Sequence, residues 1–334
     1  MSEENICKIC KNSAGNKTFT AKEMMFGTQD EFEYFKCNNC YCLQISETPK
    51  NLSSYYPSSY YSLKKPSTSK NFFQDVRLYL RSKRSEYLLK GKGFLGNTIY
   101  QLTDDFFEKN HDWDWFRKTG ADLDSNILDI GCGTGKLLRY MDIQGFKKLT
   151  GLDPYIEEDI VFGIRNAHTI HKKSLEQLEG NFDLIMLHHS FEHMEDPMSV
   201  MNQINRLLKI NHFAVIRIPL SDSYAWRKYG PNWVQLDAPR HIFLHTIKSI
   251  EILSRSTGFE ISDVVHDSTA FQFTGSELYA KGISLEQSKK NHANLIFSKK
   301  EIETFQKESE DLNLRKQGDQ ACFYLKKINF IPEK

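Results

Sequence analysis

A short run of apolar residues that leads into a glycine-rich turn constrains this chain more than any other feature. The run and the turn read Ile127-Leu128-Asp129-Ile130-Gly131-Cys132-Gly133-Thr134-Gly135. Leu137, Leu138 and Met141 follow at helical spacing. Glycines at this place allow the backbone to turn sharply and to approach a ligand closely. The pattern therefore predicts a buried strand, a ligand-binding loop and a helix.

The spacing of the glycines limits which ligand the loop can hold. A dinucleotide fingerprint requires glycine at position 136, where the chain has Lys136, and a phosphate-binding P-loop is broken by Leu137. The next predicted strand ends at Asp153, whose carboxylate can accept hydrogen bonds from both hydroxyls of a ribose. A nucleotide-binding or dehydrogenase domain with a degenerate loop is the alternative interpretation.

The Asp-x-Gly-x-Gly-x-Gly pattern closely resembles the first motif of class I S-adenosylmethionine-dependent methyltransferases. The resemblance implies that the glycines line the amino-acid end of the cofactor and that Asp153 binds its ribose. It also implies an adenine contact at Ser174 and Leu175, and a strand over 182–189 that passes beneath the methyl donor and includes His188. The predicted cofactor-binding residues are Asp129, Gly131, Gly133, Gly135, Asp153, Ser174, Leu175 and His188.

Alternating short apolar runs and amphipathic helices follow from Asn126 onward, as is typical of a doubly wound α/β fold. We expect seven strands in a mostly parallel sheet of the class I methyltransferase type, with the last strand antiparallel. Their predicted ranges are 127–130, 149–153, 168–171, 182–188, 213–219, 259–266 and 321–326. Asp196 and Thr246 are predicted to begin two helices, the second of which ends before Gly258.

Three regions are predicted along the chain. Residues 1–45 form a small zinc ribbon, and residues 46–120 form a linker and a helical region. Residues 121–334 form the cofactor-binding methyltransferase domain, which carries a lid over 219–246 and a helical insertion over 280–316. Because the chain has no apolar stretch of about 18 residues and begins with an acidic segment, we expect no membrane span, no secretory signal and a cytoplasmic location.

Four of the seven cysteines form two C-x-x-C pairs, Cys7 with Cys10 and Cys37 with Cys40. Four thiolates can close a tetrahedral zinc site, which stabilises a segment too short to build its own core. Such a site leaves no open coordination position, so the predicted Zn²⁺ is structural. Free thiols without metal are the alternative.

Methyl transfer to a hydroxyl needs a group that accepts the proton, and histidine is the usual base near neutral pH. Candidate histidines lie at the predicted carboxyl ends of strands, where doubly wound sheets place their sites. His241 is our first prediction for the catalytic base and His189 the second, whereas His193, in a Ser190-Phe191-Glu192-His193 segment, is expected to be structural. The predicted substrate-binding residues in the lid are Arg240, Trp226, Tyr229 and Trp233.

A zinc ribbon, an aromatic linker and this fold in sequence, together with the Pro239-Arg240-His241 stretch, resemble methyltransferases of sugar and surface-polysaccharide pathways. That resemblance implies a nucleotide-linked sugar or glycan as substrate. An RNA or protein methyltransferase whose ribbon docks the polymer is the alternative, and a non-enzymatic binding protein is a third. The formal net charge of +1 disfavours nucleic acid, because tight phosphate binding needs a basic face. The acceptor atom and the oligomeric state are not readable from the sequence.

Overall fold

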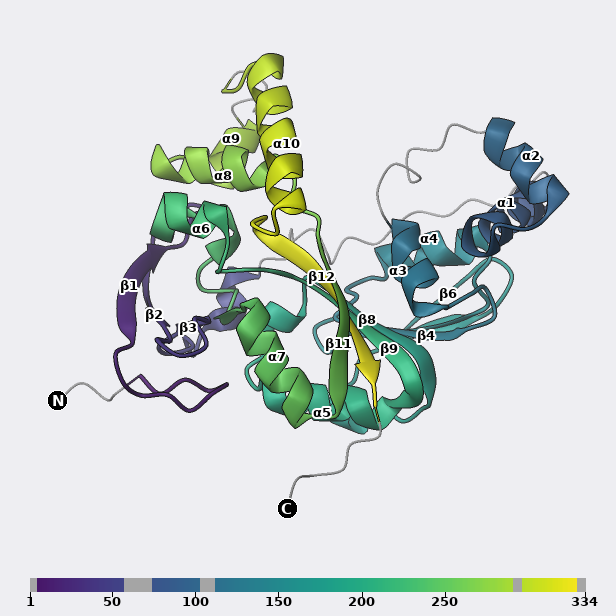
Figure 1. Ribbon diagram of the computed structural model, residues 1–334, viewed down its shortest axis with the longest axis horizontal. Coiled ribbons are helices and arrows are strands. Elements are labelled where there is room, and N and C mark those ends of the chain that lie inside the picture. The colour runs from purple at the N-terminus through teal and green to yellow at the C-terminus, as the bar shows by residue number, and fades with distance from the viewer. Residues whose placement is uncertain (1–4, 57–73, 103–111, 291–295, 329–334) are drawn as a thin grey trace.

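The computed structural model describes residues 5–56, 74–102, 112–290 and 296–328, and its centre is one large mixed sheet (Figure 1). The sheet has eight strands in the order β11-β12-β9-β8-β4-β5-β7-β6. The parallel strands β4, β5, β7, β8 and β9 span Asn126–Ile130, Lys148–Leu152, His168–His171, Phe182–His188 and Leu208–Pro219. The antiparallel β12 (Gln320–Lys327) lies between β9 and β11 (Phe259–His266).

All seven predicted strands are present, but the predicted number was wrong by one. The additional strand, β6 (Ile160–Phe162), pairs antiparallel with β7 at the edge of the sheet. Three residues with an exposed Val161 in the middle give too little alternation for a sequence pattern to indicate a strand.

The sheet is buried on both faces because consecutive strand residues point to opposite sides. Leu184 and Met186 of β8 pack with residues of α3 (Asp112–Thr119) and α4 (Lys136–Gln144). Ile185 and Leu187 pack on the other face with residues of α5 (Pro197–Leu207) and α7 (Ile247–Ser256). The helical region before the sheet also contains α1 (Gln74–Lys90) and α2 (Phe94–Leu102). Among the described residues, no helix is long and apolar enough to cross a bilayer.

Both predicted helix starts are confirmed. The Asp196 side chain accepts a hydrogen bond from the Ser199 amide at the start of α5. Thr246 accepts one from the Ser249 amide at the start of α7, and Gly258 follows that helix with a positive φ of 78°. These caps satisfy amide groups that have no partner inside the helix.

The N-terminal segment forms a second sheet that a strand from the C-terminal half of the chain completes. Strands β1 (Lys17–Lys22), β2 (Glu31–Lys36) and β3 (Leu43–Ile45) pair antiparallel, and β10 (Phe243–Leu244) adds the fourth strand. Because β10 belongs to the predicted lid, residues 1–45 do not form a closed unit by themselves. Figure 1 shows this sheet and α1–α2 at opposite ends of the molecule.

The predicted lid contains, besides β10, α6 (Tyr224–Tyr229) and short 3-10 turns at Gly230–Asn232 and Val234–Leu236. The predicted helical insertion contains α9 (Leu285–Lys290) and α10 (Lys299–Leu314), preceded by α8 (Phe271–Ala280). In Figure 1, α8, α9 and α10 gather beyond one end of β12.

A buried ion cluster joins the N-terminal sheet to the lid. The Arg240 guanidinium lies 2.9 Å from a Glu23 oxygen and 2.6 Å from an Asp237 oxygen, and the Arg240 and Glu23 side chains are fully buried. Burial alone would raise the pKa of the Asp237 carboxyl, but the charge of Arg240 lowers it. Glu23 also accepts hydrogen bonds from the backbone amides of Met25, Phe26, Gly27 and Thr28, so a glutamine in its place would turn a donor toward some of these donors and remove the charge that strengthens the bonds.

We therefore predict that Glu23→Gln lowers the free energy of unfolding by about 3 kcal/mol. Urea denaturation of the full chain measures this change. Glu31→Gln is the matched control, since Glu31 forms an exposed pair with Lys22 at 3.4 Å and should change stability by less than about 1 kcal/mol. Equal effects of the two substitutions would show that the buried cluster does not stabilise the junction.

Candidate functional site

The glycine loop leaves β4 in a tight turn that β5 holds in place. The Gly131 amide donates to the Leu152 carbonyl at 2.7 Å, and Gly131, Gly133 and Gly135 all have positive φ, at 73°, 55° and 78°. Residues with a Cβ rarely adopt this conformation. The predicted strand, loop and helix are therefore confirmed, with Gly135 immediately before α4.

Two of these glycines are also required by their neighbours. A Cβ at Gly131 would lie 2.4 Å from the Ser190 Cβ, and one at Gly135 would lie 2.4 Å from a methyl of Ile170. Ser190 in turn donates its hydroxyl hydrogen to the Ile130 carbonyl at 2.8 Å. The segment after β8 is thus packed directly against the loop, so the two ends of the candidate site are fixed relative to each other.

Asp153 lies directly after β5 and faces the loop. One carboxylate oxygen accepts the Gly133 amide at 2.8 Å, and the other accepts the Tyr155 amide at 2.9 Å. Burial raises the pKa of this carboxyl, and these two hydrogen bonds oppose the shift. Each carboxylate oxygen has a second lone pair, so both can still accept a ribose hydroxyl. The geometry fits the predicted role.

Asp129 lies inside β4 and is buried beneath the loop. Burial, followed by the nearby charge of Asp153, raises the pKa of Asp129 to about 8. A carboxyl of this kind carries its proton at neutral pH and can therefore donate as well as accept a hydrogen bond.

The remaining predicted cofactor residues lie at the expected strand ends. Ser174 and Leu175 begin a 3-10 turn (Leu175–Gln177) after β7, and the side chain of Leu175 is buried. His188 ends β8, where its ring lies 4.1 Å from the ring of Trp115 on α3. Burial, with smaller contributions from Arg217 and His189, lowers the pKa of His188 well below its usual value, so this ring is neutral.

Three histidines surround the buried carboxylate of Glu192. His189 Nδ1 lies 3.4 Å and His241 Nε2 lies 3.9 Å from one Glu192 oxygen. The ring of His193 lies 4.8 Å from that of His241, between centroids. Burial would raise the pKa of Glu192, but the histidines, His189 first, lower it to about 2. His189 directly precedes the 190–240 segment and His241 directly follows it. The fold therefore brings together two histidines that are far apart in the sequence.

The N-terminal sheet positions His241 directly. The buried Tyr34 hydroxyl of β2 donates to the His241 carbonyl at 2.8 Å. The Ile45 amide of β3 donates to the Ile242 carbonyl at 3.0 Å, and the Ile242 amide donates to the Glu192 carbonyl at 2.9 Å. This sheet thus supports one wall of the candidate site.

The four residues predicted to bind substrate are engaged in packing instead. Arg240 is fully buried and paired with Glu23 and Asp237, so a substrate phosphate would have to displace two carboxylates. Trp233 is fully buried and donates to Asp319 at 2.9 Å.

The other two lid aromatics are held in a similar way. The Trp226 ring is buried against Trp233 and Phe19, with centroid distances of 6.2 and 5.4 Å. The half-buried Tyr229 donates to Glu277 at 2.7 Å. The aromatic and basic composition of the predicted lid indicated binding residues, but composition does not reveal burial, and in this structure these side chains contact residues outside the segment.

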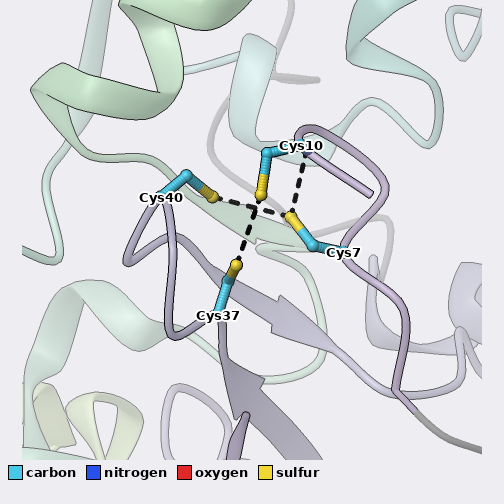
Figure 2. Close-up of side chains that lie close together, drawn as sticks. All are labelled: Cys7, Cys10, Cys37 and Cys40. Atoms are coloured by element: carbon cyan, nitrogen blue, oxygen red, sulfur yellow. Dashed lines mark hydrogen bonds between the residues drawn. The ribbon is translucent and has the colours of Figure 1, made fainter. Parts of the chain in front are cut away.

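The four predicted metal ligands converge, as Figure 2 shows. The sulfur atoms of Cys7 and Cys40 lie 3.5 Å apart, as do those of Cys10 and Cys37, and all four lie within 4.8 Å of one another. A tetrahedral zinc with bonds of about 2.3 Å requires sulfur separations of about 3.8 Å. The Gln44 amide donates to Cys7 sulfur at 2.9 Å. The donor set and its spacing therefore fit Zn²⁺.

Sequence reasoning noted the Glu192-His193 pair, but it expected His193 to be structural and gave Glu192 no role. Their place after β8, at the carboxyl edge of the sheet, was a usable signal. What the sequence did not reveal is that the Glu192 side chain is fully buried among three imidazoles.

Comparisons with known proteins agree with this geometry. A family described as a methyltransferase domain matches residues 100–264, which include the glycine loop, Asp153 and the histidine cluster. A ubiquinone biosynthesis O-methyltransferase of Pseudomonas aeruginosa (strain LESB58) is 26% identical over 170 residues, covering 45% of this chain and 71% of the relative. The protein of the same name from Sodalis glossinidius is 29% identical over 152 residues, covering 41% of this chain and 59% of the relative.

This chain is an S-adenosylmethionine-dependent methyltransferase. Its fold is that of the class I enzymes, with the β12 strand antiparallel between β9 and β11. Among solved structures, a putative sarcosine dimethylglycine methyltransferase from Galdieria sulphuraria aligns with a TM-score of 0.44 and 15% identity over 75% of this chain and 99% of that chain.

For this methyltransferase we predict that Asp153→Ala weakens S-adenosylhomocysteine binding by at least about tenfold, because hydrogen bonds to a charged group contribute about 1.5–3 kcal/mol. Titration calorimetry on the full chain measures the dissociation constant. Asp159→Ala is the control, since that exposed carboxylate pairs with His171 at 3.0 Å. Unchanged affinity in Asp153→Ala would remove Asp153 from the cofactor site.

Proposed function

We propose that this methyltransferase transfers the methyl group of S-adenosylmethionine to a hydroxyl of a sugar, either nucleotide-linked or within a glycan, and that His241 accepts the hydroxyl proton. The observation that carries the proposal is a buried histidine with an available lone pair that faces Glu192, two residues after the Ser190 that packs on the glycine loop. The alternative acceptors are a phenolic hydroxyl and a polymer.

The tautomer of His241 supports its role as the base. His241 Nδ1 lies 2.7 Å from the Gln235 carbonyl, which can only accept, so Nδ1 carries the hydrogen and Nε2 has the lone pair. Burial, then the neighbouring His193, lowers the pKa of His241 to about 4, so the ring is neutral at pH 7. The nearby carboxylates of Asp237 and Glu192 oppose that shift and would stabilise the imidazolium once it forms.

His189 is a weaker candidate for the base on the same reasoning. Its Nε2 lies 2.8 Å from an Arg217 nitrogen, which can only donate, so His189 uses its lone pair there. Its Nδ1 then carries the hydrogen and faces Glu192 at 3.4 Å. We assign His189 to orienting Glu192.

The acceptor class rests on two lines of support. The relatives reported above are named O-methyltransferases, which favours an oxygen acceptor. The sugar rests on the resemblance of the ribbon, the linker and the Pro239-Arg240-His241 stretch to sugar methyltransferases. A hydroxyl-rich acceptor also suits a site lined by imidazoles and carboxylates.

The experiment is an incubation with S-adenosylmethionine of three separate acceptor pools: nucleotide sugars, glycans and polyphenols. Mass spectrometry should detect the gain of one methyl group in a sugar pool. Methylation confined to polyphenols would replace the sugar with a phenol. Retention on heparin together with methylation of RNA would favour a polymer.

In the acceptor pool that reacts, His241→Asn should lower kcat by at least about 100-fold, the usual contribution of a positioned base, while cofactor affinity stays the same. His212→Gln is the control, because His212 is exposed and pairs with Asp183 at 3.3 Å, away from the cluster. Since the pKa of free His241 is about 4, kcat/KM should be lost only as the pH falls through that value and stay level above it. Full activity in His241→Asn would exclude it as the base.

We further propose that Cys7, Cys10, Cys37 and Cys40 hold a structural Zn²⁺. Cys37→Ser should lose the zinc that survives dialysis in the wild type, as measured by elemental analysis. Cys42→Ser is the matched control, since this buried thiol lies in the same segment but outside the group of four and donates to the Leu43 carbonyl. A wild-type chain that stays folded while its thiols hold no metal would contradict the proposal.

A further inference from the structure

Glu192, His193 and His241, here called the Glu-His-His cluster, bring one ligand atom each to within 4.8 Å of one another. The first two follow β8 in the short turn Phe191–His193, and the third comes from the lid. A base at His241 accounts for the nearby charge of Glu192 but not for the convergence of His193 on the same point.

The Glu192 carboxylate lacks the partners that a buried charge needs. It is fully buried, and neither of its oxygens accepts a hydrogen bond from any residue that the structure describes. The imidazole nitrogens that face it, His189 Nδ1 and His241 Nε2, lie 3.4 and 3.9 Å from one of its oxygens. A buried, ionised carboxylate without hydrogen bonds is very unfavourable unless it is paired or coordinates a metal.

Both histidines of the cluster are oriented in the way that metal ligands usually are. His193 Nδ1 lies 2.8 Å from the Arg240 carbonyl, and His241 Nδ1 lies 2.7 Å from the Gln235 carbonyl. A carbonyl only accepts, so each Nδ1 carries the hydrogen and each Nε2 has the lone pair. Metal-binding histidines characteristically donate their other ring hydrogen to a backbone carbonyl or a carboxylate, which fixes both tautomer and orientation.

We propose that the Glu-His-His cluster binds a divalent transition-metal ion of the Zn²⁺ class, separate from the four cysteines. Two imidazoles and one carboxylate suit such ions, whereas Mg²⁺ and Ca²⁺ prefer oxygen ligands throughout. Three protein ligands leave at least one coordination position open, as in catalytic rather than structural sites.

The open position lies beside the methyl donor, because Ser190 ties the turn after β8 to the glycine loop. A hydroxyl of the acceptor would fill that position, where the ion would lower the pKa of the hydroxyl so that its proton passes to solvent water. With its Nε2 on the ion, His241 would hold the ion and would no longer accept that proton. This role rests on the proposed function, whereas ion binding itself does not.

The test uses the full chain with its zinc in place and adds Co²⁺ in the absence of acceptor. Absorption spectroscopy separates the two sites, since Co²⁺ on thiolates gives sulfur-to-metal charge-transfer bands and Co²⁺ on nitrogen and oxygen ligands gives only d–d bands. We expect d–d bands that saturate at one equivalent without charge transfer. Glu192→Gln and His193→Gln should each weaken this binding by at least about tenfold.

His212→Gln is the matched control and should titrate like the wild type. Thermal melting shows whether each variant is folded. If Glu192→Gln does not fold, because the residue is buried, His193→Gln alone tests the site. Charge-transfer bands alone, or d–d bands unchanged in both variants, would overturn the site. This readout needs no acceptor, so it separates the two proposals. Methyl transfer to sugars without Co²⁺ binding would contradict only the proposed ion site. Co²⁺ binding without methylation of sugars would contradict only the proposed acceptor.

Discussion

The site depends on how the backbone leaves β4 at Gly131. The amide of that residue bonds to the end of β5, and its missing side chain admits Ser190 from the turn after β8. This bend therefore sets the positions of the ends of two other strands. Asp153, after β5, faces the glycine loop, and Glu192, after β8, lies two residues beyond Ser190, which packs on Gly131. The glycine loop, Asp153 and the turn that carries Glu192 are adjacent because three neighbouring parallel strands end at one edge.

The N-terminal sheet is packed into the wall that carries His241 and is not an appended module. Its fourth strand comes from the lid, its Tyr34 holds the His241 carbonyl, and its Glu23 neutralises Arg240 inside the fold. A structural zinc at one end of such a sheet would stabilise the backbone that carries His241. This gives the cysteine cluster a role in a methyltransferase without requiring a bound polymer.

The sequence predicted the large sheet well because its strands are apolar runs and because glycine or acidic residues mark where strands end. It missed β6 and β10, because strands of three and two residues are too short to show an alternating pattern of apolar and polar residues. It placed Asp153, the glycines and the four cysteines by motif spacing, which local geometry enforces. It did not predict the burial of Arg240, Trp226 and Trp233. An arginine or tryptophan in a long loop gives the same sequence pattern whether its side chain is exposed or buried.

The same limitation explains Glu192. A Glu-His pair after a strand is visible in the sequence, but the absence of hydrogen-bond partners around its carboxylate depends on tertiary packing by the lid. Only long-range contacts between residues near 190 and residues near 240 create that environment.

A crystal structure of the full chain with S-adenosylhomocysteine tests the central claim most directly. The account predicts that both ribose hydroxyls lie within hydrogen-bond distance of the Asp153 carboxylate, with the sulfur facing Glu192 and the surrounding histidines. A cofactor bound elsewhere, or a sulfur on the opposite side of the sheet edge from Glu192, would contradict it.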